Sequence, residues 1–317
     1  MAASNSEMKS PEMNILTLSD LRAKARSLLS GRSQDLNVLV VGEPGSCKST
    51  LINSMNMALA EQWSELTSFG QGGASNNTLR LDKVPMFEDQ SMKEKVENYE
   101  KKVYFWDCAG MENNLDEVYG EFIGLTLDGK VPDKTNVFDV LKDKDGLISI
   151  RALRERFATV NEENRFHRLL FLCTCDNPAP ENLLKLVKQT TASPHNKGRN
   201  IPVFLVLSKM DKIKTNESTY KATKDMAFNT LNLQGNKQRT TELSLYHAEI
   251  EGKDEGCPLD AFNMFLPNED IDRKLLILLC NLLHPAFDRT VTHGDKVEIK
   301  HVEPEKPPKK RNECKPS

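Results

Sequence analysis

Apolar and polar positions come in blocks along this chain, and the blocks predict alternating strands and helices. Residues 36–41 and 201–207 are almost entirely apolar, which is typical of strands in a parallel sheet covered on both faces. Other stretches repeat their apolar residues at helical spacing. The pattern therefore predicts one large α/β domain. The predicted strands span 36–41, 79–87, 101–106, 166–175, 201–207 and 241–250.

One predicted helix precedes these strands and the others follow them. Residues 15–30 place their leucines on one stripe, with Ser19 or Asp20 as the N-cap and Gly31 at the end. We expect this helix to pack on the domain or on a partner. Residues 128–133 predict a turn, and the stretch from there to 164 predicts irregular structure. The other predicted helices span 48–63, 115–127, 181–191, 218–233 and 269–283.

The first strand runs into a glycine-bearing loop and then a helix, the context that a phosphate-binding loop requires. Backbone N–H groups of such a loop form an anion site at the positive end of the helix. We expect Lys48 to reach the outer phosphates and the Ser49 hydroxyl to bind a magnesium ion. The alternative is a strand-to-helix turn without a ligand. The candidate nucleotide-binding residues are Gly42, Glu43, Pro44, Gly45, Ser46, Cys47, Lys48, Ser49 and Thr50.

Cys47 departs from the pattern Gly-x-x-x-x-Gly-Lys-Ser/Thr, because it stands where the last glycine belongs. If that position requires a left-handed backbone, a non-glycine residue costs about 1–2 kcal/mol there. A cost of this size corresponds to about tenfold weaker binding. We therefore expect Cys47 to weaken the phosphate site without abolishing it.

Two further strand ends carry candidate chemistry. The strand 101–106 is followed by Asp107 and, three residues later, Gly110, which is the arrangement of a magnesium and γ-phosphate sensor. The strand 201–207 is followed by Ser208, Lys209 and Asp211. There, the Asp211 carboxylate is expected to accept hydrogen bonds from the guanine edge while the Lys209 stem covers the ring. Strand-ending turns without a ligand are the alternative at both places.

Composition and charge exclude several other classes of protein. The 317 residues carry a net charge of -3 and a mean hydropathy of -0.52, which gives no indication of a nucleic-acid partner. No apolar run approaches the length of a transmembrane segment, and the first 14 residues contain no apolar signal core. A cytoplasmic protein is therefore expected. We interpret the seven scattered cysteines as reduced rather than disulfide-bonded.

With these motifs in place, the chain resembles the interferon-induced protein 44 family within the P-loop GTPases. The resemblance covers about residues 37–285 and rests on VLVVGEPGSCKSTLINS, WDCAG, EFIGLTLDGKVPD and VFLVLSKMD. It implies a three-layer α/β/α P-loop NTPase fold, like that of a G domain, with a mostly parallel central sheet. It also implies binding of GTP or GDP with Mg²⁺, held at Ser49, Thr78 and Asp107, and a role in immune or antiviral responses.

The domain organisation follows from the motifs and the composition at the ends. We expect a disordered N-terminus over 1–14, an amphipathic helix over 15–31, the P-loop domain over 36–287 and a disordered basic tail over 288–317.

The same motifs predict slow chemistry at best. Many GTPases place a glutamine directly after the sensor glycine to orient the attacking water, whereas this chain has Met111 there, followed by Glu112. We expect a GTP-dependent switch whose hydrolysis needs a protein partner or self-association. One alternative is a pseudo-GTPase scaffold, disabled at Cys47. Another is an ATP-using P-loop enzyme such as a kinase, which the base-reading Asp211 argues against.

Overall fold

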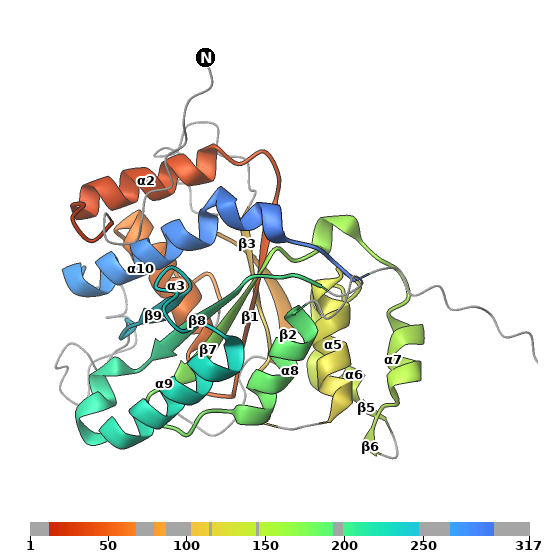
Figure 1. Ribbon diagram of the computed structural model, residues 1–317. Coiled ribbons are helices and arrows are strands. Elements are labelled where there is room, and N and C mark those ends of the chain that lie inside the picture. Colours follow the sequence, from red (N-terminus) through yellow and green to blue (C-terminus); the bar gives the residue numbers. More distant parts are fainter. Residues whose placement is uncertain are drawn as a thin grey trace, which may run out of the picture.

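The computed structural model describes residues 13–67, 79–86, 103–113, 116–143, 146–192, 199–246 and 267–294. A seven-stranded sheet forms its centre, with the strand order β4-β2-β3-β1-β7-β8-β9 (Figure 1). From β3 to β9 all neighbours are parallel, whereas β2 is antiparallel to β3 and β4. The strands are β1 (Leu36–Gly42), β2 (Arg80–Pro85), β3 (Val103–Asp107), β4 (Thr135–Asn136), β7 (Arg168–Thr174), β8 (Val203–Ser208) and β9 (Thr240–Glu242).

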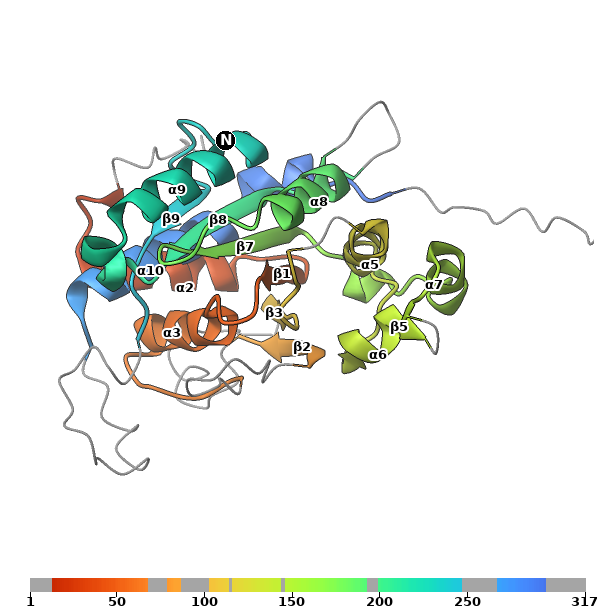
Figure 2. The ribbon, with the colours of Figure 1, turned by 90° about the horizontal axis from the view of Figure 1, so that it is seen from below.

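Helices cover both faces of this sheet (Figure 2). The residues of β1 show how the two faces separate, since Val38 and Val40 enter one apolar cluster while Leu39 and Val41 enter the other. The first cluster contains α2 (Leu18–Ser30), α3 (Lys48–Ala60) and α10 (Glu269–Leu283). The second contains α5 (Glu117–Leu127), α8 (Glu181–Thr191) and α9 (Glu217–Leu231). The expected three-layer α/β/α fold with a mostly parallel sheet is confirmed.

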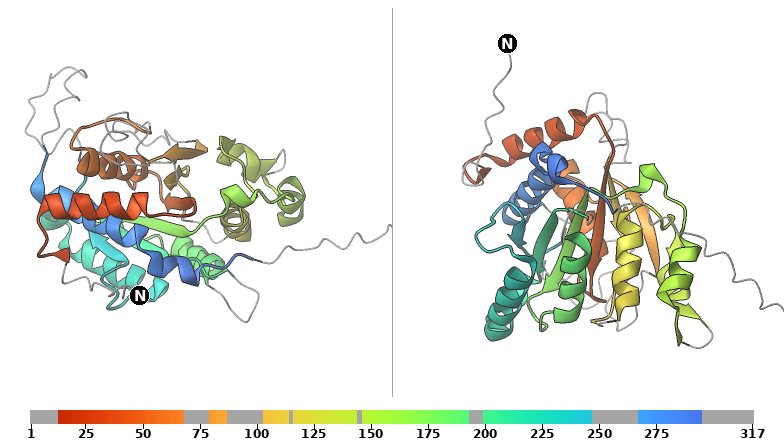
Figure 3. Two further views of the ribbon diagram at one scale, coloured as in Figure 1. Left: turned by 90° about the horizontal axis from the view of Figure 1, so that it is seen from above. Right: turned by 45° about the vertical axis from the view of Figure 1, so that its right-hand side comes forward.

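The N-terminal helix α2 packs within the domain, beside α10 and over the end of α3 (Figure 3). Its N-cap is Thr17, whose side chain and that of Asp20 form a reciprocal capping box, so the predicted caps at Ser19 or Asp20 are wrong by two or three positions. Gly31 ends the helix as expected. Ile15, predicted inside the helix, lies before it and is 84% exposed.

Residues 128–164 are more regular than predicted. They contain β4, α6 (Val137–Leu141), a hairpin of β5 (Lys142–Asp143) and β6 (Gly146–Leu147), α7 (Ile150–Arg156) and a 3-10 turn at Glu162–Asn164. Asn136 and Ser149 cap the two short helices with their side chains. Helices this short are unstable alone. They form here because Val137 and Leu153 are buried in the cluster under α5, which no local pattern reveals.

Several boundaries also differ from the predictions. The last strand was expected over 241–250, but β9 ends at Glu242 and residues 247–250 lie outside the described part. The C-terminal tail was expected from 288, yet the chain continues through a 3-10 turn at Pro285–Thr290 and a bridge between Asn200 and Thr292. Asp288 and Thr292 therefore contact residues at or just before the starts of β7 and β8. Within the described residues, no helix combines the length and apolarity needed to cross a bilayer.

Candidate functional site

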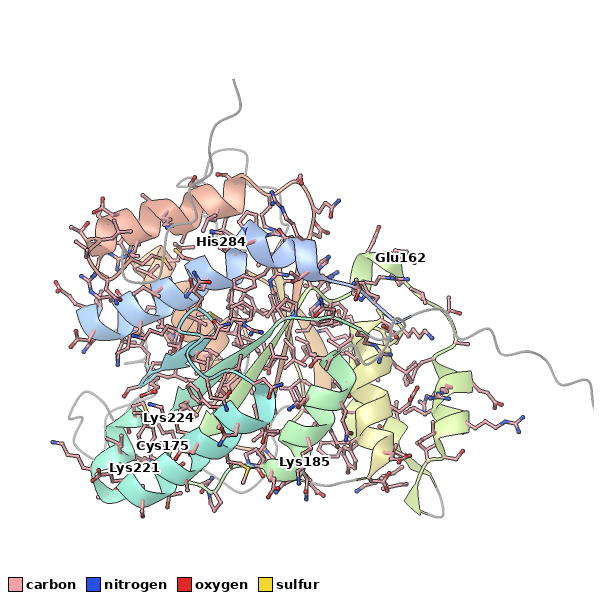
Figure 4. The ribbon with its side chains drawn as sticks, in the orientation of Figure 1. Glu162, Cys175, Lys185, Lys221, Lys224 and His284 are labelled. Carbon is pink, nitrogen blue, oxygen red and sulfur yellow. The ribbon has the colours of Figure 1, made fainter. Side chains whose placement is uncertain are left out.

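The three sequence motifs meet at one edge of the sheet. Parallel strands end on the same side, and β1 ends at Gly42, β3 at Asp107 and β8 at Ser208. Strand β7 lies between β1 and β8 in the sheet, and Cys175 directly follows it in the chain. Figure 4 shows Cys175 toward the end of the sheet where these strands finish, and His284 and Glu162 toward the opposite end. The topology therefore brings together the phosphate loop, the Asp107 turn and the Lys209 turn.

The loop after β1 has the backbone that close approach to an anion requires. A Cβ at Gly42 would come within 2.6 Å of Ser46 Oγ and 2.7 Å of the Leu172 carbonyl oxygen, so only glycine fits there. Gly45 has φ +72, a conformation that favours glycine. Cys47 has φ 69 and ψ 32, which confirms that the departing residue occupies a left-handed position.

This conformation carries the cost expected for Cys47. A non-glycine residue in the left-handed region is strained by about 1–2 kcal/mol, and Cys47 is one of the described residues with a positive φ. Cys47 is also the N-cap of α3 and makes no side-chain capping hydrogen bond. The amides of the first turn of α3 thus receive no cap from Cys47, which leaves them suited to an anion.

Lys48 is held inside the loop. Its Nζ donates to the carbonyl oxygens of Gly42 at 3.3 Å and Glu43 at 3.0 Å, and its side chain is buried. Burial lowers the pKa of Lys48, and the charge of Asp107 opposes that shift. A phosphate oxygen would be a better partner for the ammonium group than these neutral carbonyls.

A second group of oxygens lies at the start of α3. The Ser49 hydroxyl donates to Asp107 Oδ2 at 2.5 Å, and the Thr67 hydroxyl donates to the same oxygen at 3.0 Å. Asp107 is fully buried, and its Oδ1 has no hydrogen-bond partner in the described part of the chain. Burial raises the pKa of Asp107, opposed by the hydrogen bond from Ser49. Carboxylate and hydroxyl oxygens with one unsatisfied position fit Mg²⁺ and its water shell.

The sequence placed Thr78 at this metal corner, but Thr78 lies outside the described residues. Thr67, which the sequence analysis did not select, places its hydroxyl at this corner. A hydroxyl residue following a helix is too common a pattern to select it from the sequence alone.

The turn after β8 is linked to the loop after β1. The Ser208 hydroxyl donates to the carbonyl oxygens of Ser46 at 3.4 Å and Cys173 at 3.3 Å, so Ser208 links β8 with its neighbours. Lys209 has a left-handed backbone, and its Nζ contacts Asp176 Oδ2 at 3.1 Å. Asp211 follows in the 3-10 turn Met210–Thr215.

Asp176 is a second residue of this corner that the sequence did not select. It follows β7, and its ion pair holds the Lys209 ammonium group. Burial raises the pKa of Asp176, but hydrogen bonds from Thr174 and Lys209 outweigh burial and lower it overall. The sequence does contain one signal for Asp176, which is its position just after β7, the strand that precedes β8 in the chain.

The segment after Asp107 is fixed to the loop by its backbone. The Met111 N–H donates to the Gly42 carbonyl oxygen at 3.1 Å, and the Met111 side chain is buried. Gly110 is buried beside it, whereas Glu112 is exposed. Farther along, the Asn113 side chain accepts from the N–H groups of Asn182 and Leu183, at the start of α8. Met111 therefore contributes its backbone to the site and not its side chain.

Comparison with known proteins finds similarity only among solved structures. No protein-family model matches this chain, and no curated protein does either. A dimerization-deficient mutant of Toc33 from Arabidopsis thaliana is 15% identical, with 89% of this chain and 98% of that chain covered and a TM-score of 0.44. Toc33 with Mg²⁺ and GMPPNP is 14% identical, with 90% and 100% covered and a TM-score of 0.45.

Similarity this low assigns no function. The fold of this chain is defined by its own strand order and strand directions. The resemblance to the interferon-induced protein 44 family rests on the sequence motifs alone.

Proposed function

We propose that this chain is a guanine-nucleotide-binding P-loop protein that acts as a GTP-dependent switch. The observation that carries the proposal is the contact of Ser49 with Asp107 at 2.5 Å, across 58 residues of sequence, at the N-terminus of the helix that follows the loop. A hydroxyl and a carboxylate in this place are the pair that holds a magnesium ion against nucleotide phosphates.

Each part of the nucleotide has residues suited to it. The amides of the loop and of the first turn of α3 bind the phosphates, with Lys48 contributing charge. Ser49 and Asp107 hold Mg²⁺, which neutralises charge on the phosphates when it is bound. Lys209 covers one face of the base, and Asp211 accepts from the guanine ring edge. Gly110 contributes its N–H to the γ-phosphate.

Hydrolysis by the isolated chain is expected to be slow. The position after the sensor glycine is Met111, whose side chain is buried and carries no group that orients water. We infer that a partner protein or a second copy of the chain accelerates the reaction. In line with the resemblance, we expect a cytoplasmic protein with a role in immune or antiviral responses.

A pseudo-GTPase scaffold is the second candidate, and one observation favours it. Lys48 and Asp107 are satisfied in part by the protein itself, through the loop carbonyls and the Ser49 and Thr67 hydroxyls. A site closed by its own hydrogen bonds has less need of a ligand.

Calorimetric binding of GTP, GDP and ATP in the presence of Mg²⁺ tests the proposal. Wild type is expected to prefer guanine nucleotides, and Lys48→Ala to bind them about 100-fold more weakly, because a charge-assisted contact to phosphate is lost. Lys185→Ala is the matched control, since Lys185 lies exposed on α8 in an ion pair with Glu181 (Figure 4).

The remaining outcomes separate the alternatives. Equal binding of ATP and GTP would indicate an ATP-using enzyme. Cys47→Gly is expected to bind guanine nucleotides up to about tenfold more tightly, because glycine removes the left-handed strain of about 1–2 kcal/mol at this position. If wild type binds no nucleotide and Cys47→Gly does, the loop is a disabled phosphate site and the scaffold function is correct.

A further inference from the structure

Thr67 reaches the metal corner from a segment that no sequence motif marks. It follows the end of α3, and its hydroxyl donates to Asp107 Oδ2 at 3.0 Å. Forty residues separate Thr67 and Asp107 along the chain, so their contact depends on how the segment after α3 folds back along that helix.

A buried asparagine of α3 fixes the backbone of Thr67. The Asn53 Oδ1 atom accepts from the N–H groups of Leu66 at 3.0 Å and Thr67 at 3.1 Å, and its Nδ2 donates to the Thr67 carbonyl oxygen at 2.9 Å. Asn53 is fully buried. One turn later, Asn56 Nδ2 donates to Ser64 Oγ at 2.6 Å. The segment is therefore attached to the helix that also carries Lys48 and Ser49.

The two oxygens of Asp107 are used unequally. Oδ2 accepts from both hydroxyls, whereas Oδ1 is buried and has no hydrogen-bond partner among the described residues. A hydroxyl that donates its proton keeps lone pairs for another partner. Ser49 can thus donate to Asp107 and offer its oxygen to a cation, while Oδ1 remains available to the water shell of that cation.

We propose that Thr67 is a positioning residue of the magnesium corner. Its hydroxyl, fixed in place by Asn53, holds Oδ2 of Asp107 and so leaves Oδ1 for the hydrated Mg²⁺. The inference rests on the proposed function.

The test compares nucleotide affinity in Mg²⁺ with affinity in EDTA. Thr67→Val keeps the branched shape and removes the hydroxyl. It is expected to reduce the Mg²⁺-dependent gain in GTP affinity about tenfold, the effect of one hydrogen bond to a charged group, and to leave affinity in EDTA unchanged. Thr67→Ser restores the gain. Thr126→Val is the control for loss of a threonine hydroxyl, because Thr126 is buried and donates at 2.8 Å to a carbonyl of its own helix α5, away from the metal corner.

The outcomes distinguish this inference from the function on which it rests. If wild type binds no nucleotide, the proposed function fails and the role of Thr67 fails with it. If wild type shows a Mg²⁺-dependent gain and Thr67→Val shows the same gain, only the role of Thr67 fails. Equal losses for Thr67→Val in Mg²⁺ and EDTA indicate a purely structural residue and also overturn it. A wild type that binds equally with and without Mg²⁺ overturns the metal corner itself.

Discussion

The two edges of the sheet bury charged groups in opposite ways. At the carboxyl edge, Lys48 contacts backbone carbonyls and Asp107 contacts hydroxyls. At the amino edge, Arg168 is fully buried at the start of β7 and pairs with Asp288 at 2.6 Å, while Arg32 reaches the same carboxylate at 3.1 Å. The fully buried guanidinium at the amino edge is joined directly to a carboxylate, whereas Lys48 and Asp107 at the carboxyl edge contact neutral groups. The Lys209–Asp176 ion pair at the carboxyl edge is only partly buried.

This difference separates a structural cluster from a binding site. The fully buried guanidinium of Arg168 is paired directly with a carboxylate, and the Asp288 side chain is 36% exposed. Asp107 accepts hydrogen bonds from neutral hydroxyls and keeps one buried oxygen without a hydrogen-bond partner in the described part of the chain, and such a group lowers stability until something binds it. The Nε atom of Arg168 is also buried without such a partner, but the same guanidinium is paired with a carboxylate. We therefore expect substitutions at the amino edge to reduce folding stability, and substitutions at the carboxyl edge to reduce binding while sparing or raising stability.

The edges also differ in their response to acid. Burial lowers the pKa of His167 at the amino edge to about 4, so protonation of His167 opposes folding. Burial raises the pKa of Asp107 at the carboxyl edge, so protonation of Asp107 favours folding. Lowering the pH is therefore expected to reduce folding stability through His167 and to increase it through Asp107.

The largest expected effect comes from breaking the ion pair at the amino edge. Arg168→Met keeps an unbranched apolar stem but removes the contacts to Asp288 and to the carbonyl of Phe287. It should lower the free energy of unfolding by about 3–5 kcal/mol, measured by urea denaturation, because the fully buried guanidinium loses its hydrogen bonds to Asp288 and to the carbonyls of His167 and Phe287. Arg151→Met is the control, because the Arg151 side chain is exposed on α7. This substitution should change stability by less than about 0.5 kcal/mol. A loss below about 1 kcal/mol for Arg168→Met would remove the contrast between the edges.

A second prediction concerns pH. The unfolded chain protonates His167 near pH 6.5 and the folded chain only near 4, so stability falls as the pH falls between these values. The expected contribution is about 3 kcal/mol. The Nδ1 atom of His167 accepts from the Asn37 N–H, and His167→Asn offers an amide oxygen there without the titration.

Denaturation curves between pH 7 and 4 check this prediction. Wild type should lose more stability across the range than His167→Asn does. His293, whose pKa is also lowered by burial, contributes in the same direction in both proteins. Its ring lies 6.4 Å from that of His167, so the double variant His167→Asn/His293→Asn separates the two contributions. Parallel losses in the two proteins would show that His167 does not titrate within this window.

The smallest expected effect has the opposite sign and lies at the carboxyl edge. Asp107→Asn removes a buried charge, so the nucleotide-free protein should gain about 1–2 kcal/mol of stability at pH 7 and lose the Mg²⁺ dependence of nucleotide binding. Thermal unfolding and calorimetry measure the two effects. Asp225→Asn, on the exposed face of α9, should change neither. A destabilised Asp107→Asn protein that keeps its Mg²⁺ dependence would mean that Asp107 is a structural residue.

The sequence by itself determined the elements whose signals are local. The apolar periodicity predicted helices over 181–191 and 269–283, and α8 and α10 have these bounds, Glu181–Thr191 and Glu269–Leu283. The loop pattern placed Lys48 and Ser49 at the start of α3. Because parallel strands end on one side, the strand-end residues Asp107 and Lys209 were also predictable as neighbours of that loop.

Only the tertiary structure decided which side chains complete the site and which segments become ordered. Thr67 reaches Asp107 because Asn53 holds its backbone, and Asp176 reaches Lys209 because β7 lies beside β8. The short helix α7 exists because Leu153 is buried under α5. Each of these contacts joins residues distant in sequence. Their energy depends on sheet order and burial, which the local periodicity of a chain does not encode.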